Sequence, residues 1–218
     1  MNLNVINLAS RPDRWFHICV SFIGHPVVRF NALTHPAGGW VGCTQSHAAL
    51  LRKLQQEDAS GIYTVLEDDC HLLCTRDEFD ARWPKYKEYL AAHQGEWDLF
   101  LGGGIYPVPT RIVCRDPFII ECDWAVCLQF AVYTDRSAKT MIDYAEQTEW
   151  DTACDNNLAR NHRGKIWLPY PMFCGQLEGT PSDIASPEQQ AVVWSEFKKA
   201  VHTLDEFVRN QNDKDNKG

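Results

Sequence analysis

The segment Ile62-Tyr63-Thr64-Val65-Leu66-Glu67-Asp68-Asp69-Cys70 decides the fold of this chain. Its first half is a short apolar and β-branched run after a glycine, which is typical of a strand buried on both faces. Its second half places three consecutive carboxylates where that strand ends. Because ligands of open α/β sheets bind at the carboxyl ends of the strands, the carboxylates indicate a ligand site.

A divalent cation is the simplest partner for Glu67, Asp68 and Asp69. Three like charges repel one another, and burying any of them costs several kcal/mol unless a positive group is close. Mg²⁺ and Mn²⁺ bind carboxylate oxygens and also bridge to phosphates. The alternative is a solvated acidic turn at the strand end, since acidic loops are common.

Length and composition predict one domain over residues 1–209 and a polar tail over residues 210–218. The chain has 218 residues, and 44% of them are hydrophobic, which is enough for a substantial core. The net charge of −8 argues against a protein that binds nucleic-acid backbones. It remains compatible with a small anionic ligand held by a few arginines.

Cysteine usage predicts a reducing, cytoplasmic environment. The nine cysteines are odd in number, form no CxxC pair and lack zinc-finger spacing, so we expect free thiols. We also expect no signal peptide and no transmembrane segment, because no apolar run approaches the roughly 20 residues that span a bilayer. Peripheral contact with a membrane surface stays open.

Hydrophobic periodicity places strands and helices along the whole chain. Besides the strand at 62–67, we expect strands at 4–8, 27–32, 97–101, 112–114, 118–122, 125–133 and 165–168. We expect helices at 13–23, from 43 to about 54, and at 77–93, 135–147 and 187–209.

Two pairs of polar residues are candidate contacts for an anion. Arg11 and Arg14 follow the first strand, where they would contact a nucleotide or diphosphate, or be solvated charges at a helix start. Ser46 and His47 are expected in the first turn of the helix that begins near residue 43, and a helix amino terminus favours anions. A structural hydrogen bond is the alternative role for the histidine.

A second acidic site contains Asp151 and Asp155, which are four residues apart. On a helix these two carboxylates would share one face, and like charges at that spacing are mildly destabilising. The spacing therefore indicates either a ligand or a helix-cap role for Asp151.

Several segments, taken in chain order, resemble glycosyltransferase family 25, the lipopolysaccharide-type and collagen-type β-galactosyltransferases. The resemblance spans about residues 4–184, and its order and spacing matter more than any single motif. The similar segments are Val5-Ile6-Asn7-Leu8 with Arg11-Pro12-Asp13-Arg14, Phe30-Asn31-Ala32, Gly42-Cys43 with Ser46-His47, Val65-Leu66-Glu67-Asp68-Asp69, Asp98-Leu99-Phe100-Leu101-Gly102, and Gln176 with Ser182-Asp183-Ile184.

The resemblance implies a single-domain α/β fold of the GT-A type, with a mixed, mainly parallel sheet flanked by helices. It also implies metal-dependent transfer of a sugar, often galactose, from a UDP-sugar to a hydroxyl of a glycan such as lipooligosaccharide, with inversion. Mn²⁺ or Mg²⁺ would bind Glu67, Asp68 and Asp69. Because neighbouring side chains of an extended chain point opposite ways, Glu67 and Asp69 would form one pair, with Asp68 turned toward the sugar or the core.

The resemblance also implies roles for the remaining candidate residues. Inversion needs a general base near the acceptor hydroxyl, for which Asp155 is the first choice and Asp151 the alternate. The donor nucleotide would contact Asn7, Arg11, Arg14, Ser46, His47, Gln176, Ser182 and Asp183. Two other functions stay open: a non-catalytic nucleotide-sugar-binding relative, and a different metal-dependent phosphate-handling enzyme, although the chain has no P-loop.

Overall fold

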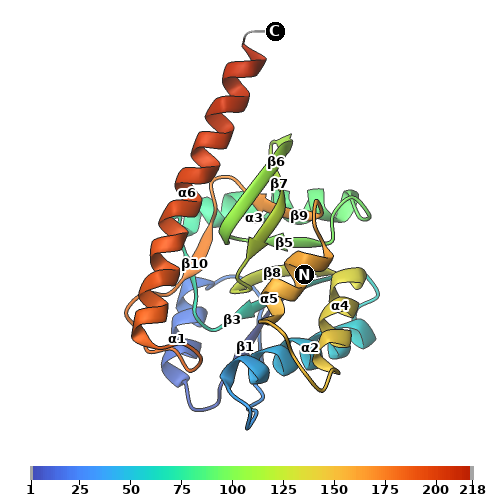
Figure 1. Ribbon diagram of the computed structural model, residues 1–218, viewed down its shortest axis with the longest axis vertical. Helices are drawn as coiled ribbons and strands as arrows, with labels where there is room; N and C mark the ends of the chain where they lie inside the picture. Colours follow the sequence, from blue (N-terminus) through green and yellow to red (C-terminus); the bar gives the residue numbers. More distant parts are fainter. Residues whose placement is uncertain (1, 217–218) are drawn as a thin grey trace.

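The computed structural model describes residues 2–216 and is built around one large sheet (Figure 1). Its strands are β1 (Leu3–Asn7), β2 (Val27–Asn31), β3 (Ile62–Glu67), β5 (Leu99–Leu101), β6 (Ile105–Arg115), β7 (Phe118–Val126), β8 (Phe130–Thr134) and β9 (Ile166–Pro169). Their order across the sheet is β2-β1-β3-β8-β5-β9-β7-β6, and only β8 and β7 run against the others. The predicted α/β fold with a mixed, mainly parallel sheet is confirmed.

Helices cover both faces of this sheet. They are α1 (Pro12–Ser21), α2 (Gly39–Glu57), α3 (Arg76–Ala92), α4 (Asp135–Ala145), α5 (Cys154–Asn161) and α6 (Pro187–Asp215). On one face α1 and α3 bury an aromatic-rich cluster that includes Phe79, Trp83 and Phe130. On the other face α2, α4, α5 and α6 bury a mainly aliphatic cluster. Each cluster removes large apolar side chains from water, which is the main stabilising contribution to such a fold.

Strand β3 lies between β1, to which it is parallel, and β8, to which it is antiparallel. Its first five residues are buried, as the apolar run predicted. The chain then turns at Asp68 and Asp69 and continues as a short strand, β4 (Cys70–Leu72). This strand pairs with β10 (Cys174–Gln176) in a separate two-stranded sheet. The pairing brings Gln176 next to the three carboxylates.

The strands after residue 102 differ from the prediction in two places. β6 begins at Ile105 and runs through Pro107 and Pro109, which is tolerated because β6 is the edge strand and loses few ladder hydrogen bonds there. The single strand expected at 125–133 is instead broken, because Cys127 adopts a left-handed conformation with φ of 90°. The break separates β7 from β8.

The expected polar tail at 210–218 is helical as far as Asp215, so that boundary was placed too early. Arg115 of β6 stabilises the extension through hydrogen bonds to Asn212 (2.9 Å) and Asp215 (2.7 Å). The end of α6 projects beyond the sheet (Figure 1). Residues 217–218 lie outside the described part of the chain. Within residues 2–216, no helix combines the length and apolar character that crossing a membrane would need.

Gly103 marks a close approach between two backbones. A Cβ atom built on it would lie 1.8 Å from the carbonyl oxygen of Cys174, the first residue of β10. Gly103→Ala should therefore lower the free energy of unfolding by about 3 kcal/mol, because the strand must move to relieve the overlap. Gly95→Ala is the control, since no atom lies within 4 Å of its Cβ position and only its left-handed φ of 92° is penalised, by about 1 kcal/mol. If urea denaturation showed the same loss in free energy of unfolding for Gly103→Ala and Gly95→Ala, the close approach at Gly103 would be contradicted.

Candidate functional site

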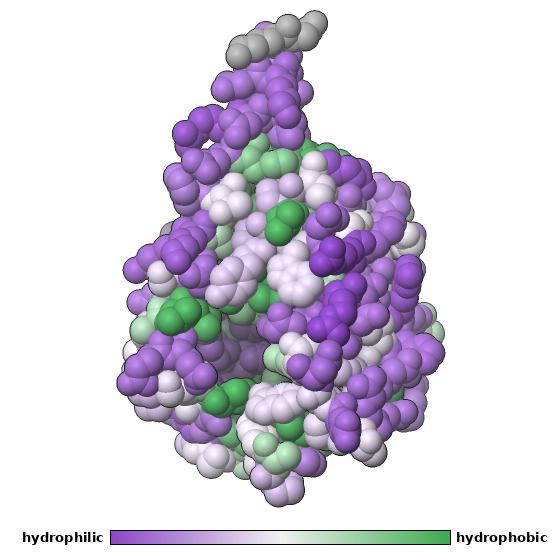
Figure 2. Space-filling view, in the orientation of Figure 1, coloured by the Kyte–Doolittle hydropathy of each residue, from purple (hydrophilic) through white to green (hydrophobic). Residues whose placement is uncertain are grey.

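A cavity of about 470 Å³ opens at the carboxyl ends of β1, β2 and β3. Figure 2 shows a hollow with a hydrophilic floor on this face of the molecule. One part of the cavity is apolar and is lined by Ile6, Leu8 and Leu33. The other part is lined by four carboxylates, from Glu67, Asp68, Asp69 and Asp183.

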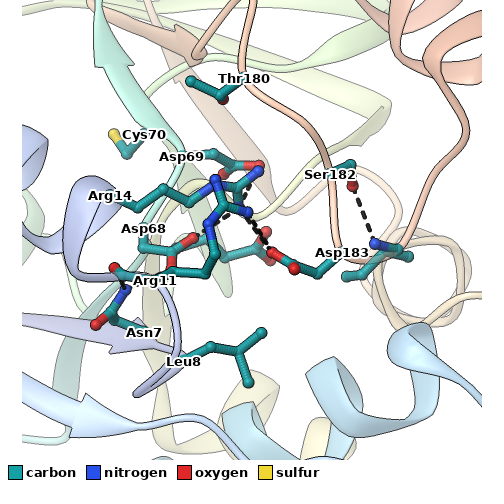
Figure 3. A network of polar contacts seen from close by, with 12 residues as sticks. Asn7, Leu8, Arg11, Arg14, Asp68, Asp69, Cys70, Thr180, Ser182 and Asp183 are labelled. Atoms are coloured by element: carbon teal, nitrogen blue, oxygen red, sulfur yellow. Dashed lines mark hydrogen bonds and ion pairs between the residues drawn. The ribbon is translucent and has the colours of Figure 1, made fainter.

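Asp68 is neutralised by the protein itself. Its carboxylate is buried and accepts hydrogen bonds from Arg14 Nη1 at 2.9 Å and from Asn7 Nδ2 at 2.7 Å (Figure 3). Asn7 is fully buried and does not line the cavity, so it holds Asp68 rather than facing a ligand. Asp68 thus lines the cavity with its charge already paired to Arg14, which leaves Glu67 and Asp69 as the carboxylates available to a ligand.

Asp69 has an incomplete set of partners. Its Oδ2 accepts a hydrogen bond from Gln176 Nε2 at 2.9 Å, but its buried Oδ1 has no hydrogen-bond partner among the described residues. Burial, followed by the negative charge of Glu67, raises the pKa of Asp69 to about 7. Leaving a buried acceptor without a donor costs free energy. A cation bound at Oδ1 would remove this cost, since Arg14 Nη1 lies near the other oxygen, 3.9 Å from Oδ2.

Glu67 lies beside Asp69 with a different set of partners. Burial acts to raise its pKa, but hydrogen bonds from His47 (3.1 Å) and Cys43 (3.6 Å), together with nearby positive charge, lower the pKa below its usual value. Glu67 is therefore ionised at neutral pH, and its charge adds to the negative potential of the cavity.

These features fit a hard divalent cation between Glu67 and Asp69. Mg²⁺ and Mn²⁺ bind carboxylate oxygens, and the Oδ1 atom of Asp69 offers one without a competing donor. The cavity lining also contains four carboxylates but only one arginine, Arg14, and no lysine. A diphosphate would be repelled by such a lining, whereas a bound cation would reverse the local charge.

A second, smaller cavity of about 180 Å³ adjoins the first. Both cavities are lined by Glu67, Asp69 and Gln176, so the carboxylate pair lies at their junction. Cys43 and Ile184 also line both cavities. The rest of the second cavity is formed by Trp40 of α2, Cys127, Leu128 and Gln129 of the break between β7 and β8, Ala153, Cys154 and Asp155 at the start of α5, and Val193 of α6.

Asp155 is the carboxylate of the second cavity that lies away from the junction. Its Oδ2 accepts a hydrogen bond from the backbone N–H of Cys127 at 3.2 Å, and its Oδ1 accepts one from the N–H of Asn156 at 2.7 Å. Burial raises the pKa of Asp155, and these two hydrogen bonds only partly oppose the shift. The left-handed backbone at Cys127 thus orients a carboxylate whose basicity is increased by burial.

Arg11 and Arg14 hold one wall of the larger cavity in place (Figure 3). Arg11 Nη1 contacts Asp183 Oδ2 at 2.6 Å and also pairs with Asp13, while Arg14 Nη2 donates to the carbonyl of Pro181 at 2.8 Å. Only Arg14 lines the cavity, and both guanidinium groups are engaged by protein oxygens. The pair joins α1 to the loop that precedes α6.

Ser182 and Gln176 occupy the cavity lining in different ways. Ser182 Oγ accepts hydrogen bonds from the N–H groups of Ile184 (3.1 Å) and Ala185 (3.0 Å), which shapes the loop before α6. Gln176 instead directs its amide at Asp69 from β10. Both side chains face the cavity, together with Asp183.

The expectation that Ser46 and His47 lie in a first helical turn is wrong. Helix α2 begins at Gly39, so both residues lie two turns further in and cannot offer the free N–H groups of a helix start. Gly39 permits close packing, since a Cβ atom on it would lie 2.7 Å from the carbonyl oxygen of Asp183. Ser46 lines the larger cavity, whereas His47 is fully buried behind Glu67.

The expectation that Asp151 and Asp155 share a helix face is also wrong. Helix α5 begins only at Cys154 and is preceded by Ala153 as its N-cap, so Asp151 is neither helical nor a cap. Asp151 is exposed, lines neither cavity and forms an ion pair with Arg160 at 2.7 Å. The hydrogen bond and charge of Arg160 lower the pKa of Asp151.

Three residues that line the second cavity could hardly be predicted from the sequence. Trp40 precedes the helix expected from residue 43, Leu128 lies in an expected strand, and Val193 lies in a helix distant in the chain. Apolar residues in such segments usually belong to the core. Of the three, only Trp40 follows a pair of glycines, Gly38 and Gly39, which is a composition typical of loops close to ligands.

Comparison with known proteins gives similarity of fold. No family model and no curated protein match the chain. The chain is similar to a glycosyltransferase involved in the glycosylation of the major capsid of PBCV-1, with a TM-score of 0.51 and 6% identity over 83% of this chain and 95% of that chain. It is also similar to A197 from STIV (TM-score 0.43, 10% identity, 86% of this chain and 100% of that chain) and to apo UDP-glucose pyrophosphorylase (0.42, 10%, 95% and 81%). The first likeness shows a GT-A-like fold, and the other two scores are too low to support an argument.

Proposed function

We propose that this protein is a metal-dependent, inverting glycosyltransferase that moves a sugar, galactose in the first instance, from a UDP-sugar to a hydroxyl of a glycan such as a lipooligosaccharide. The observation that supports it most is the meeting of two cavities at Glu67 and Asp69, with Asp155 in the second cavity. Group transfer between two substrates needs such an arrangement, in which donor and acceptor meet at the charged centre.

The larger cavity suits the nucleotide part of the donor. The apolar part, between Leu8 and Leu33, would take the base, and the diphosphate would lie toward Glu67 and Asp69. Mn²⁺ or Mg²⁺ held by these two carboxylates would supply Lewis-acid stabilisation of the departing diphosphate. Gln176 keeps the carboxylate of Asp69 oriented toward the cavity through its 2.9 Å hydrogen bond.

The second cavity suits the acceptor. Asp155 would accept the proton of the attacking hydroxyl, and its carboxylate is fixed for this by the backbone N–H of Cys127. Trp40 offers an apolar ring face of the kind on which sugars stack, and Val193 closes the other side of the cavity. Because the hydroxyl would approach from this side, opposite the leaving diphosphate, the geometry favours inversion.

A thermal-shift panel of nucleotide sugars tests the donor proposal. A UDP-sugar with Mn²⁺ at about 100 times its Kd should stabilise the protein by about 2.7 kcal/mol, which raises the Tm by roughly 5–10 °C in a chain of this length. The shift should disappear when chelator removes the metal. A shift that persists in chelator would refute the metal requirement, and no shift with any nucleotide sugar would refute the donor class.

Product analysis separates transfer from the other two functions. Release of UDP that depends on an added glycan acceptor is expected for a transferase. Binding without turnover would instead identify a non-catalytic relative, and release of pyrophosphate would identify a different phosphate-handling enzyme.

A further inference from the structure

Three side chains with different donor atoms, from Cys43, His47 and Glu67, lie close together. Glu67 Oε1 lies 3.1 Å from His47 Nε2 and 3.6 Å from Cys43 Sγ. One ligand atom from each residue lies within 4.8 Å of the other two, which holds for no other such group among residues 2–216. A tetrahedral Zn²⁺ site, with bonds of about 2.0–2.3 Å, places its ligand atoms roughly 3.2–3.8 Å apart. The observed separations need little adjustment to reach that geometry.

The elements that hold these ligands are rigid. Cys43 and His47 are four residues apart on α2, so their side chains share one helix face, and Glu67 ends the buried strand β3. Tyr133 Oη lies 3.0 Å from His47 Nδ1 and fixes the ring with Nε2 toward Glu67. Such an outer hydrogen bond to the second ring nitrogen is a regular feature of histidine metal ligands.

The donor set selects the type of metal. Mg²⁺ and Mn²⁺ prefer sites made of oxygen atoms, whereas a thiolate, an imidazole and a carboxylate together favour Zn²⁺. Cys43 and Glu67 line both cavities, so an ion can enter from solvent and water can take a fourth position. On binding, the thiol of Cys43 gives up its proton to water.

We propose that Cys43, His47 and Glu67 form a binding site for Zn²⁺ that is distinct from the oxygen site at Asp69. Glu67 belongs to both sites, so zinc draws this carboxylate away from Asp69 and inhibits the enzyme. The binding of zinc does not depend on the proposed transfer reaction, whereas the inhibition rests on it.

Cobalt spectroscopy tests the site without any measurement of activity. One equivalent of Co²⁺ should give the visible bands of a tetrahedral ion and a near-ultraviolet thiolate-to-cobalt band, and one equivalent of Zn²⁺ should remove both. The thiolate band should be lost in Cys43→Ser. It should persist in Cys127→Ser, which changes another thiol of the second cavity but not the cluster. A band that survives Cys43→Ser, or that is lost only in Cys127→Ser, overturns the assignment.

Two further measurements keep the proposal falsifiable if Cys43→Ser fails to fold. X-ray absorption of the zinc-loaded, unsubstituted protein should show sulfur at about 2.3 Å beside nitrogen or oxygen at about 2.0–2.2 Å, and a shell of oxygen alone overturns the site. Tyr133→Phe should weaken zinc binding on the order of tenfold by releasing the ring of His47, and unchanged affinity contradicts the orienting role. Zinc should also abolish the Mn²⁺-dependent rise in Tm that a UDP-sugar produces. If no such rise occurs without zinc, the proposed function fails, while the cobalt spectra still decide whether the zinc site exists.

Discussion

Asp69→Asn should make the metal-free protein more stable while abolishing metal-dependent donor binding. In the folded protein the pKa of Asp69 is raised from 3.8 to about 7, chiefly by burial. The contribution of this group to stability is therefore greatest below about pH 4 and is lost as the pH rises through 7. The shift of about three units corresponds to a penalty of up to about 4 kcal/mol above pH 7, which an uncharged side chain avoids.

The measurement is urea denaturation in chelator at pH 5 and pH 8. The free energy of unfolding of Asp69→Asn should exceed that of the unsubstituted protein by about 2–4 kcal/mol at pH 8. The difference should be smaller at pH 5, because Asp69 of the unsubstituted protein is mostly protonated at that pH. The asparagine carbonyl can still accept the hydrogen bond from Gln176, so packing is kept. A variant that is less stable at both pH values would show that the cavity does not penalise this charge. Retained donor binding with Mn²⁺ would instead exclude Asp69 as a metal ligand.

Asp155→Asn should reduce kcat by about 10³-fold while leaving donor affinity within a few-fold of the unsubstituted value. A general base typically contributes 10²–10⁴-fold, and asparagine cannot accept the proton of the acceptor hydroxyl. Burial raises the pKa of Asp155, so in the unsubstituted enzyme kcat should fall with decreasing pH at a midpoint above the usual aspartate value of 3.8. That fall should be absent from the residual activity of Asp155→Asn.

Asp151→Asn is the matched control, because it is the same chemical change at an exposed carboxylate outside both cavities. Its kcat should stay within about twofold, since the change affects only contacts outside both cavities, the ion pair with Arg160 and a 3.5 Å hydrogen bond from Tyr144 Oη. If Asp151→Asn greatly reduced kcat while Asp155→Asn changed it little, Asp151 rather than Asp155 would be the general base. A collapse of donor binding in Asp155→Asn would show that Asp155 binds the donor or its metal.

Local sequence patterns were sufficient for the strands before residue 102 and for the position of the carboxylates. The apolar, β-branched run before Glu67 favoured a strand covered on both faces, which the structure confirms, and carboxylates at the carboxyl end of such a strand lie where ligands of α/β sheets bind. The divergence of Asp68 from its two neighbours also followed from the alternation of side chains along an extended chain. These features depend on neighbours in sequence, which is why a single sequence reveals them.

The rest of the site depends on contacts between distant segments. Gly39 precedes the helix expected from residue 43, but it is the first residue of α2 and makes room for the backbone at Asp183. The left-handed turn at Cys127 breaks an apolar run that has no local signal for a break, since neither glycine nor proline is present there. Both differences from the predicted elements, at Gly39 and at Cys127, lie next to the cavities. There the chain departs from regular structure and thereby places functional groups.

The tether between Arg11 and Asp183 joins residues 172 positions apart in the chain. During synthesis, the carboxylates at the end of β3 emerge from the ribosome long before the loop that lines one wall of the larger cavity. A nascent chain that ends before residue 180 has the acidic centre but lacks the wall formed by Ser182 and Asp183. The larger cavity is therefore completed only after the loop at 180–186 has been synthesised, and a shorter nascent chain carries the acidic centre with that wall missing.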